Sequence, residues 1–211
     1  QAAVPATDRK DVPPLQPVAV LDRVLWVALA ACGSTILLAM TNHICQDVAV
    51  VPFLWILPLS LYLISFIICF DKDVWYQRPI WITLLVVALF PMLRLMFQEF
   101  TAEAETLVYQ VSVFSTVLFA CCMVCHGELA RRRSAVPHLT TFYLYVALGG
   151  ALGGAFVNLV APYIFSGFWE LHIALAGTFI LAGICIGIDN KVIKNRKDRL
   201  AFGSAWSVAA V

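Results

Sequence analysis

Charged residues are scarce in this chain. Only 13% of its 211 residues are Asp, Glu, Lys or Arg, roughly half the share found in soluble domains, and 62% are hydrophobic. The formal net charge is +1, so no general attraction to nucleic acid is expected. The sequence also lacks a P-loop, a dinucleotide-binding fingerprint and a hydrolase nucleophile motif. These absences favour a membrane protein without a familiar catalytic signature.

Long apolar runs dominate instead. They are about 20 residues long, which a helix needs to cross a ~30 Å hydrocarbon core. We therefore predict an all-α, polytopic transmembrane helical bundle of about six to seven spans. Six spans are expected at about residues 21–40, 52–70, 79–97, 107–125, 140–165 and 171–188. The predicted organisation is a polar, Pro-rich segment at 1–20, a six-span domain at 21–189, a basic loop at 190–199 and the start of a seventh span at 200–211.

The loops between these spans alternate in charge. The loop at 98–105 carries three glutamates and no base. Two other loops are basic, and by the positive-inside rule both are expected to be cytoplasmic. Counting spans backwards places the N-terminus on the cytoplasmic side as well. The basic residues of the two loops are Arg131, Arg132 and Arg133, then Lys191, Lys194, Arg196, Lys197 and Arg199.

Small residues cluster in the fifth predicted span. Gly149 and Gly153 are spaced by four, and so are Gly150 and Gly154, within "LGGALGGAF". Such pairs leave one helix face bare, so that another backbone can approach closely. The expectation is tight packing within the chain; a face for a partner subunit or a moving gate is the alternative. Asn158 follows in the same span and is expected to link helices, or alternatively to touch a substrate.

The segment "CCMVCHGELARRR" at 121–133 contains Cys-x-x-Cys-His, the peptide that holds a c-type haem. Haem at Cys122, Cys125 and His126 is disfavoured, because the motif is expected on the last turn of an apolar helix. The three arginines that follow place it on the cytoplasmic side, whereas haem is attached on the other side. Zinc is also disfavoured, since no second Cys/His pair at zinc spacing follows. We therefore expect no cofactor, no metal and no catalytic residue.

Polar residues near the ends of spans are candidates for a ligand or proton site. His43 and Asp47 lie in "TNHICQDVAVVP", between the first two spans, where a polar cluster is either a substrate or proton site or a solvated turn. His126 and Glu128 belong to "CHGEL", at the expected inner end of the fourth span. His43, Asp47, His126 and Glu128 are therefore the candidate polar or ligand-binding residues, the first two near the outer ends of spans and the last two at the inner end.

Two longer segments carry a resemblance to a known family. They are "TNHICQDVAVVPFLWILPLSLYLISFIICFD" (41–71) and "CHGELARRRSAVPHLTTFYLYVALGGALGGAFVNLVAP" (125–162). Together they resemble the membrane region of bacterial spermidine synthase-like membrane proteins, which are also described as fused transporter/spermidine synthase proteins. The resemblance implies a bacterial cytoplasmic (inner) membrane location, and stresses Cys125-His126-Gly127-Glu128 without requiring a cysteine at the position of Cys122.

In that family an aminopropyltransferase-like domain follows the membrane region. This sequence has neither the Gly-rich nucleotide loop nor the acidic residues of such a domain, so we expect no enzyme activity in it. The chain begins with Gln and its last apolar run stops partway, so we expect it to be a piece of a longer protein.

The leading functional hypothesis is a non-catalytic integral membrane module that anchors or assembles a partner, for instance an accessory subunit of a larger membrane complex. It would lie in the lipid bilayer beside protein partners. One alternative is a transporter core for a polyamine or other small organic solute, which would need acidic residues inside the membrane. The predicted spans contain almost none. A haem-binding electron-transfer subunit is the second alternative.

Overall fold

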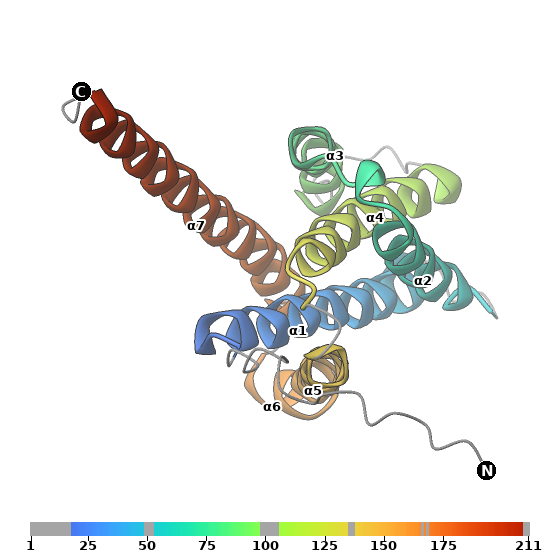
Figure 1. The fold of residues 1–211 in the computed structure, drawn as a ribbon. Helices are drawn as coiled ribbons and strands as arrows, with labels where there is room; N and C mark the ends of the chain where they lie inside the picture. The colour runs from blue at the N-terminus through green and yellow to red at the C-terminus, as the bar shows by residue number, and fades with distance from the viewer. Residues whose placement is uncertain are drawn as a thin grey trace, which may run out of the picture.

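The structure is a computed structural model that describes residues 18–48, 53–97, 106–134, 138–165, 167 and 169–208. These residues form helices joined by short connections, with no β-strand among them (Figure 1). The predicted all-α helical bundle is therefore confirmed. Its helices are α1 (Val20–His43), α2 (Ile56–Asp71), α3 (Arg78–Phe97), α4 (Leu107–Arg131), α5 (Leu139–Ala155), α6 (Ala161–Ile164) and α7 (Trp169–Val208).

Short helical turns of other types complete the chain. A π-helix, η1 (Ile44–Val48), extends α1, and a 3-10 turn, η2 (Asp73–Trp75), follows α2. A second π-helix, η5 (Phe156–Val160), joins α5 to α6, so these three elements form one apolar segment from Leu139 to Ile164. Pro162 is the second residue of α6. Its ring would clash with the carbonyl four residues earlier if the preceding turn were a regular α-helical turn. The wider π turn accommodates this proline within the span.

Among the described residues, five helical segments are long and apolar enough to cross a membrane, and α2 is a shorter apolar helix of 16 residues. The five segments are Val20–Gln46, Arg78–Met96, Leu107–Arg131, Leu139–Ile164 and Trp169–Lys191. They correspond to five of the six predicted spans. The chain is thus a multi-pass membrane protein.

Helices α1 and α4 form the centre of the bundle. Helix α1 packs against α5, α4 and α7, while α4 also packs against α2 and α3. Figure 1 shows α1 across the middle, with α5 and α6 on one side of it and α2, α3 and α4 on the other. Every residue of α4 from Ala120 to Leu129 is buried, so this stretch contacts protein on all sides. A polar group on it must therefore find its partner inside the protein.

Two helices extend beyond the predicted spans. Helix α4 ends at Arg131 rather than at Cys125, and α7 continues as a helix to Val208. The segment predicted as a loop at 190–199 and the segment predicted to start another span at 200 both belong to this one continuous helix. No proline or glycine lies between Ile188 and Phe202, and lysine and arginine are good helix formers. Polar residues end an apolar run without ending a helix.

Candidate functional site

The segment Cys125–Glu128 of α4 is the centre of the candidate site. Consecutive residues of an α-helix point about 100° apart, so these four side-chain positions face different neighbours. Cys125 lies 3.9 Å from the hydroxyl of Thr178 in α7, and His126 contacts Ser65 in α2. A side chain at Gly127 would collide with the ring of Tyr76, so the missing side chain makes room for that ring. The whole segment is buried.

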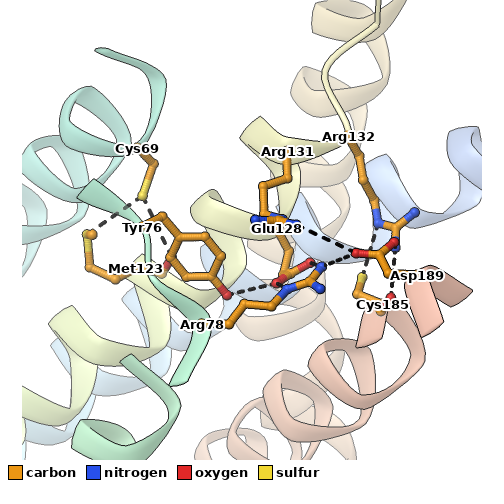
Figure 2. A network of polar contacts seen from close by, with 9 residues as sticks. All are labelled: Cys69, Tyr76, Arg78, Met123, Glu128, Arg131, Arg132, Cys185 and Asp189. Carbon is orange, nitrogen blue, oxygen red and sulfur yellow. Dashed lines mark hydrogen bonds and ion pairs between the residues drawn. The ribbon is translucent and has the colours of Figure 1, made fainter. Parts of the chain in front are cut away.

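Glu128 is fully buried and has three hydrogen-bond donors around it (Figure 2). The Tyr76 hydroxyl donates to Oε1 over 2.8 Å. Arg78, the first residue of α3, donates from Nε to Oε1 over 2.5 Å and from Nη2 to Oε2 over 2.6 Å. This two-pronged geometry matches the planar guanidinium to the planar carboxylate and gives strong, charge-assisted bonds. Burial and the neighbouring carboxylate raise the pKa of Tyr76 well above its usual range, so its phenol stays a neutral donor.

Asp189 of α7 extends this arrangement to a second arginine (Figure 2). Its Oδ2 lies 2.7 Å from Nη2 of Arg78, and its Oδ1 accepts from Nη2 of Arg132 over 3.2 Å. Arg132 also donates to the carbonyl of Cys185 over 3.1 Å, and its own carbonyl accepts from the indole of Trp26 over 2.9 Å. We name the set Tyr76, Arg78, Glu128, Arg132 and Asp189 the charge network.

The charge network joins five parts of the chain at one end of the bundle. It contains two carboxylates and two guanidinium groups, so its charges balance. Beside it, Trp26, Leu129, Phe142 and Cys185 belong to one buried apolar cluster contributed by α1, α4, α5 and α7. Each carboxylate of the network is held by arginine, so neither is available as a free acid, base or cation ligand. The arrangement is suited to fixing helices against one another.

His126 belongs to a separate buried pair. Its Nδ1 lies 2.9 Å from Oγ of Ser65, which also donates to the carbonyl of Tyr62 over 2.7 Å. The rings of Tyr62 and Phe66 meet the imidazole edge to face. A serine beside a histidine can act as an activated nucleophile, but Ser65 and His126 are at most 1% exposed. Buried in this way, the pair serves to connect α2 to α4.

The candidate polar residues His43 and His126 lie in separate places in the structure. His43 is half-buried at the end of α1, where its ring packs edge to face on Phe114, with the centroids 4.5 Å apart. Phe114 and His126 are 12 residues apart on α4, about 18 Å along the helix axis. His126 and Glu128 are moreover interior residues with different partners, rather than a turn at a helix end. The side chain of Asp47 lies outside the described residues, so its role as a candidate stays a prediction.

The glycines of α5 fall into two faces. At Gly149 an added Cβ would collide with the backbone carbonyl of Val27, and at Gly153 with that of Ala31. These two glycines thus lie against the backbone of α1. A Cβ at Gly150 would meet nothing within 4 Å, and one at Gly154 would meet only a Leu38 methyl at 3.7 Å.

Asn158 does not link helices. Its side chain is exposed, and its Nδ2 donates over 2.9 Å to the carbonyl of Gly154 in the preceding turn. Local bonding of this kind satisfies the amide within its own segment, so no second helix is required. The prediction of a helix-linking role for Asn158 is wrong.

Cys122 and Cys125 lie inside α4, more than a turn before its end, and not on its last turn as predicted. Both are at most 1% exposed. The thiol of Cys32 in α1 lies 3.4 Å from the Thr178 hydroxyl, which also neighbours Cys125. Within the part of the chain that the structure describes, no three His, Cys, Asp or Glu side chains are grouped so as to hold a metal ion.

Sequence reasoning missed Ser65, Tyr76, Arg78 and Asp189 as partners of the "CHGE" segment. One signal was present in the sequence. Arg78, Glu128 and Asp189 lie near the ends of three apolar runs, on the side predicted to be cytoplasmic. Arg78 is positively charged, whereas Glu128 and Asp189 are negatively charged. Such charges can neutralise one another only if the helix ends meet. The pattern does not tell which of them pair.

A pocket of about 900 Å³ opens beside the charge network. It lies among the start of α1, the end of α4, the start of α5 and Asp189 of α7. Its lining includes Trp26, Arg131, Arg132, Arg133 and Ser134. We name it the basic-end pocket.

Comparison with known proteins does not assign the chain to a family. No family model, no curated protein and no solved structure matches it.

Proposed function

We propose that this chain is a non-catalytic integral membrane module that assembles a protein partner in the bacterial cytoplasmic membrane. The proposal agrees with the resemblance of its sequence to the membrane region of spermidine synthase-like proteins. The observation that carries it is the length of α7.

Helix α7 contains 40 residues, which corresponds to about 60 Å at 1.5 Å per residue. Only its first part, Trp169–Lys191, is an apolar span. In Figure 1 the C-terminal half of α7 points away from the bundle, and no other helix lies beside it. Most helical stability in proteins comes from packing, and an isolated helix is marginal in water. A partner packed along this extension would supply that missing stabilisation.

The charge network supports a structural rather than a catalytic role. Glu128 accepts three hydrogen bonds, and Asp189 is shared between Arg78 and Arg132. A transporter for an organic cation would need a carboxylate that a substrate can reach. Glu128 is already neutralised by Arg78, so the transporter alternative has less support. The electron-transfer alternative has less support too, because Cys122 and Cys125 are packed between helices.

Site-specific photo-crosslinking in the full chain tests the proposal. A photoreactive residue would replace Val192 or Leu200 in the extension of α7, and Val87 as the matched control. Val87 is 63% exposed on the apolar surface of α3, where lipid contact is expected. We expect one protein adduct of defined mass from the two α7 positions and none from Val87.

Native mass spectrometry of the gently solubilised complex should then show that same partner at a fixed stoichiometry. A chain that is monomeric and yields only lipid adducts at all three positions would contradict the proposed function.

A further inference from the structure

The basic-end pocket has more positive than negative charge on its walls. Four arginines and two aspartates line it. Two of these arginines are held by carboxylates, Arg78 by Glu128 and Asp189, and Arg132 by Asp189. The second lining aspartate, Asp22, lies 3.9 Å from Arg132. The charge network therefore pairs Asp189 with two of the four arginines, Arg78 and Arg132.

The other two arginines, Arg131 and Arg133, keep most of their binding capacity. Arg131 approaches a carboxylate only at 3.9 Å, and its side chain is 47% exposed. Arg133 is exposed and takes part in none of the ion pairs among the described residues. Each guanidinium is a planar fork that fits two oxygens of a phosphate group. The pocket thus presents two such forks on its wall.

Other groups around the pocket also favour an anion. The hydroxyl of Ser134 lies on its wall. Both α1 and α5 begin at it, and neither helix has a side-chain hydrogen bond capping its first turn. Backbone N–H groups at a helix start carry partial positive charge, which adds to the attraction of the arginines.

We propose that the basic-end pocket binds a phosphate group at the membrane surface through Arg131 and Arg133. The pocket lies at the end of the spans, between helices, where the headgroups of the bilayer lie. Basic pockets in this position bind the headgroups of anionic lipids. An anionic phospholipid is therefore the principal source of the phosphate, and a soluble phosphate ester offers the same chemistry.

Binding would be measured on the full chain in detergent by native mass spectrometry and by thermal stabilisation. The ligands are short-chain phosphatidylglycerol, phosphatidylcholine of the same chain length, and sn-glycerol 3-phosphate. The test variant is the double substitution Arg131→Gln with Arg133→Gln. Both side chains are exposed, so folding should be unaffected. The matched control is Arg94→Gln, since Arg94 is an exposed arginine near the other end of α3.

We expect phosphatidylglycerol to bind at least about ten-fold more tightly than phosphatidylcholine, because only the former carries net charge. This preference should weaken at high salt, vanish in the double variant and persist in Arg94→Gln. Preference for the lipid over sn-glycerol 3-phosphate would identify the lipid as the source; equal binding of both would support the phosphate site with a soluble source. Equal binding of the two lipids, or an unchanged preference in the double variant, would overturn the proposal.

Discussion

At the scale of single residues, Glu128 is the position on which the most interactions depend. A carboxylate with no exposed surface is costly unless a cation and hydrogen-bond donors surround it. Tyr76 and Arg78 supply both, from the connection between α2 and α3 and from the start of α3. Gly127 leaves the space that the Tyr76 ring occupies. The "HGE" sequence is therefore explained by two sets of neighbours: His126 contacts Ser65, while Gly127 and Glu128 both accommodate Tyr76.

Replacing Glu128 by Gln should destabilise the folded protein by about 3 kcal/mol, because it leaves Arg78 with Asp189 as its only counter-charge. The amide oxygen of glutamine can still accept the hydrogen bond from Tyr76. The loss of stability therefore reflects mainly the missing negative charge. The free energy of unfolding would be measured in mixed micelles by titration with sodium dodecyl sulfate.

Asp71→Asn is the matched control for this change. Asp71 is an exposed carboxylate at the end of α2, where a substitution should change stability by less than about 0.5 kcal/mol. Equal stability of the Glu128→Gln variant and this control would contradict the role assigned to the charge network.

At the scale of elements, the contact between α1 and α5 depends on two glycines and not on all four. Gly149 and Gly153 lie against the backbone of α1, while Gly150 and Gly154 face away from that backbone. The spacing of four in the sequence identifies both pairs equally. Only the rotation of α5 about its axis decides which pair faces the neighbour, and the sequence pattern does not specify that rotation.

Gly149→Ala should therefore destabilise the protein by about 1–3 kcal/mol, because its new methyl group would meet the Val27 carbonyl and lie 2.8 Å from Cβ of Ala30. Gly150→Ala should be neutral or stabilising by up to about 1 kcal/mol, since it gains helix propensity in open space. The same unfolding titration compares the two variants. Identical effects at these adjacent positions would show that α5 packs through another face.

The positions of the spanning helices followed from the apolar runs, but the ends of α4 and α7 did not. Hydropathy reports contact with lipid, whereas a helix continues as long as its backbone bonds are satisfied. Arg131 and the basic residues after Asp189 therefore mark the end of a span without marking the end of a helix.

The partners within the site were also beyond prediction. Tyr76 and Glu128 are 52 positions apart in the sequence, and Ser65 and His126 are 61 apart. Composition and spacing identify a buried polar residue, but its partner is fixed only when helices pack in three dimensions. The sequence identifies the "CHGE" segment as distinctive, but it does not show which neighbours its residues contact.

At the scale of the whole molecule, contacts at one end of the bundle give an expectation for the number of membrane crossings among the described residues. Asp22 near the start of α1 lies 3.9 Å from Arg132 just beyond the end of α4. The two ends are on the same side only if an even number of crossings separates them. Helices α1, α3 and α4 are three, so α2 must be the fourth, although it has only 16 residues. With α5–α6 and α7, we therefore expect six crossings within the part of the chain that the structure describes.

This count gives a sharp expectation for sidedness. Arg133 and Lys191 are exposed residues at the basic end, and Arg94 lies 16 residues, or about 24 Å, beyond Arg78 along α3. Because the positive-inside rule places the basic end in the cytoplasm, Arg133→Cys and Lys191→Cys should react with an impermeant maleimide only in inside-out vesicles. Arg94→Cys should react only in right-side-out vesicles. The half-buried Cys45 would first be replaced by Ser in every variant to remove background labelling.

Labelling of Arg133→Cys and Lys191→Cys from opposite faces would mean an odd number of crossings between them, which is incompatible with the ion pairs that join Asp189 to Arg131 and Arg132. Labelling of both from the outer face would preserve the six crossings and invert the orientation. The charge network would then lie outside, and the sidedness argued from the basic loops would be wrong. Labelling from opposite faces would contradict the number of crossings, whereas labelling of both residues from the outer face would contradict only the orientation. The experiment therefore tests the architecture and the orientation separately.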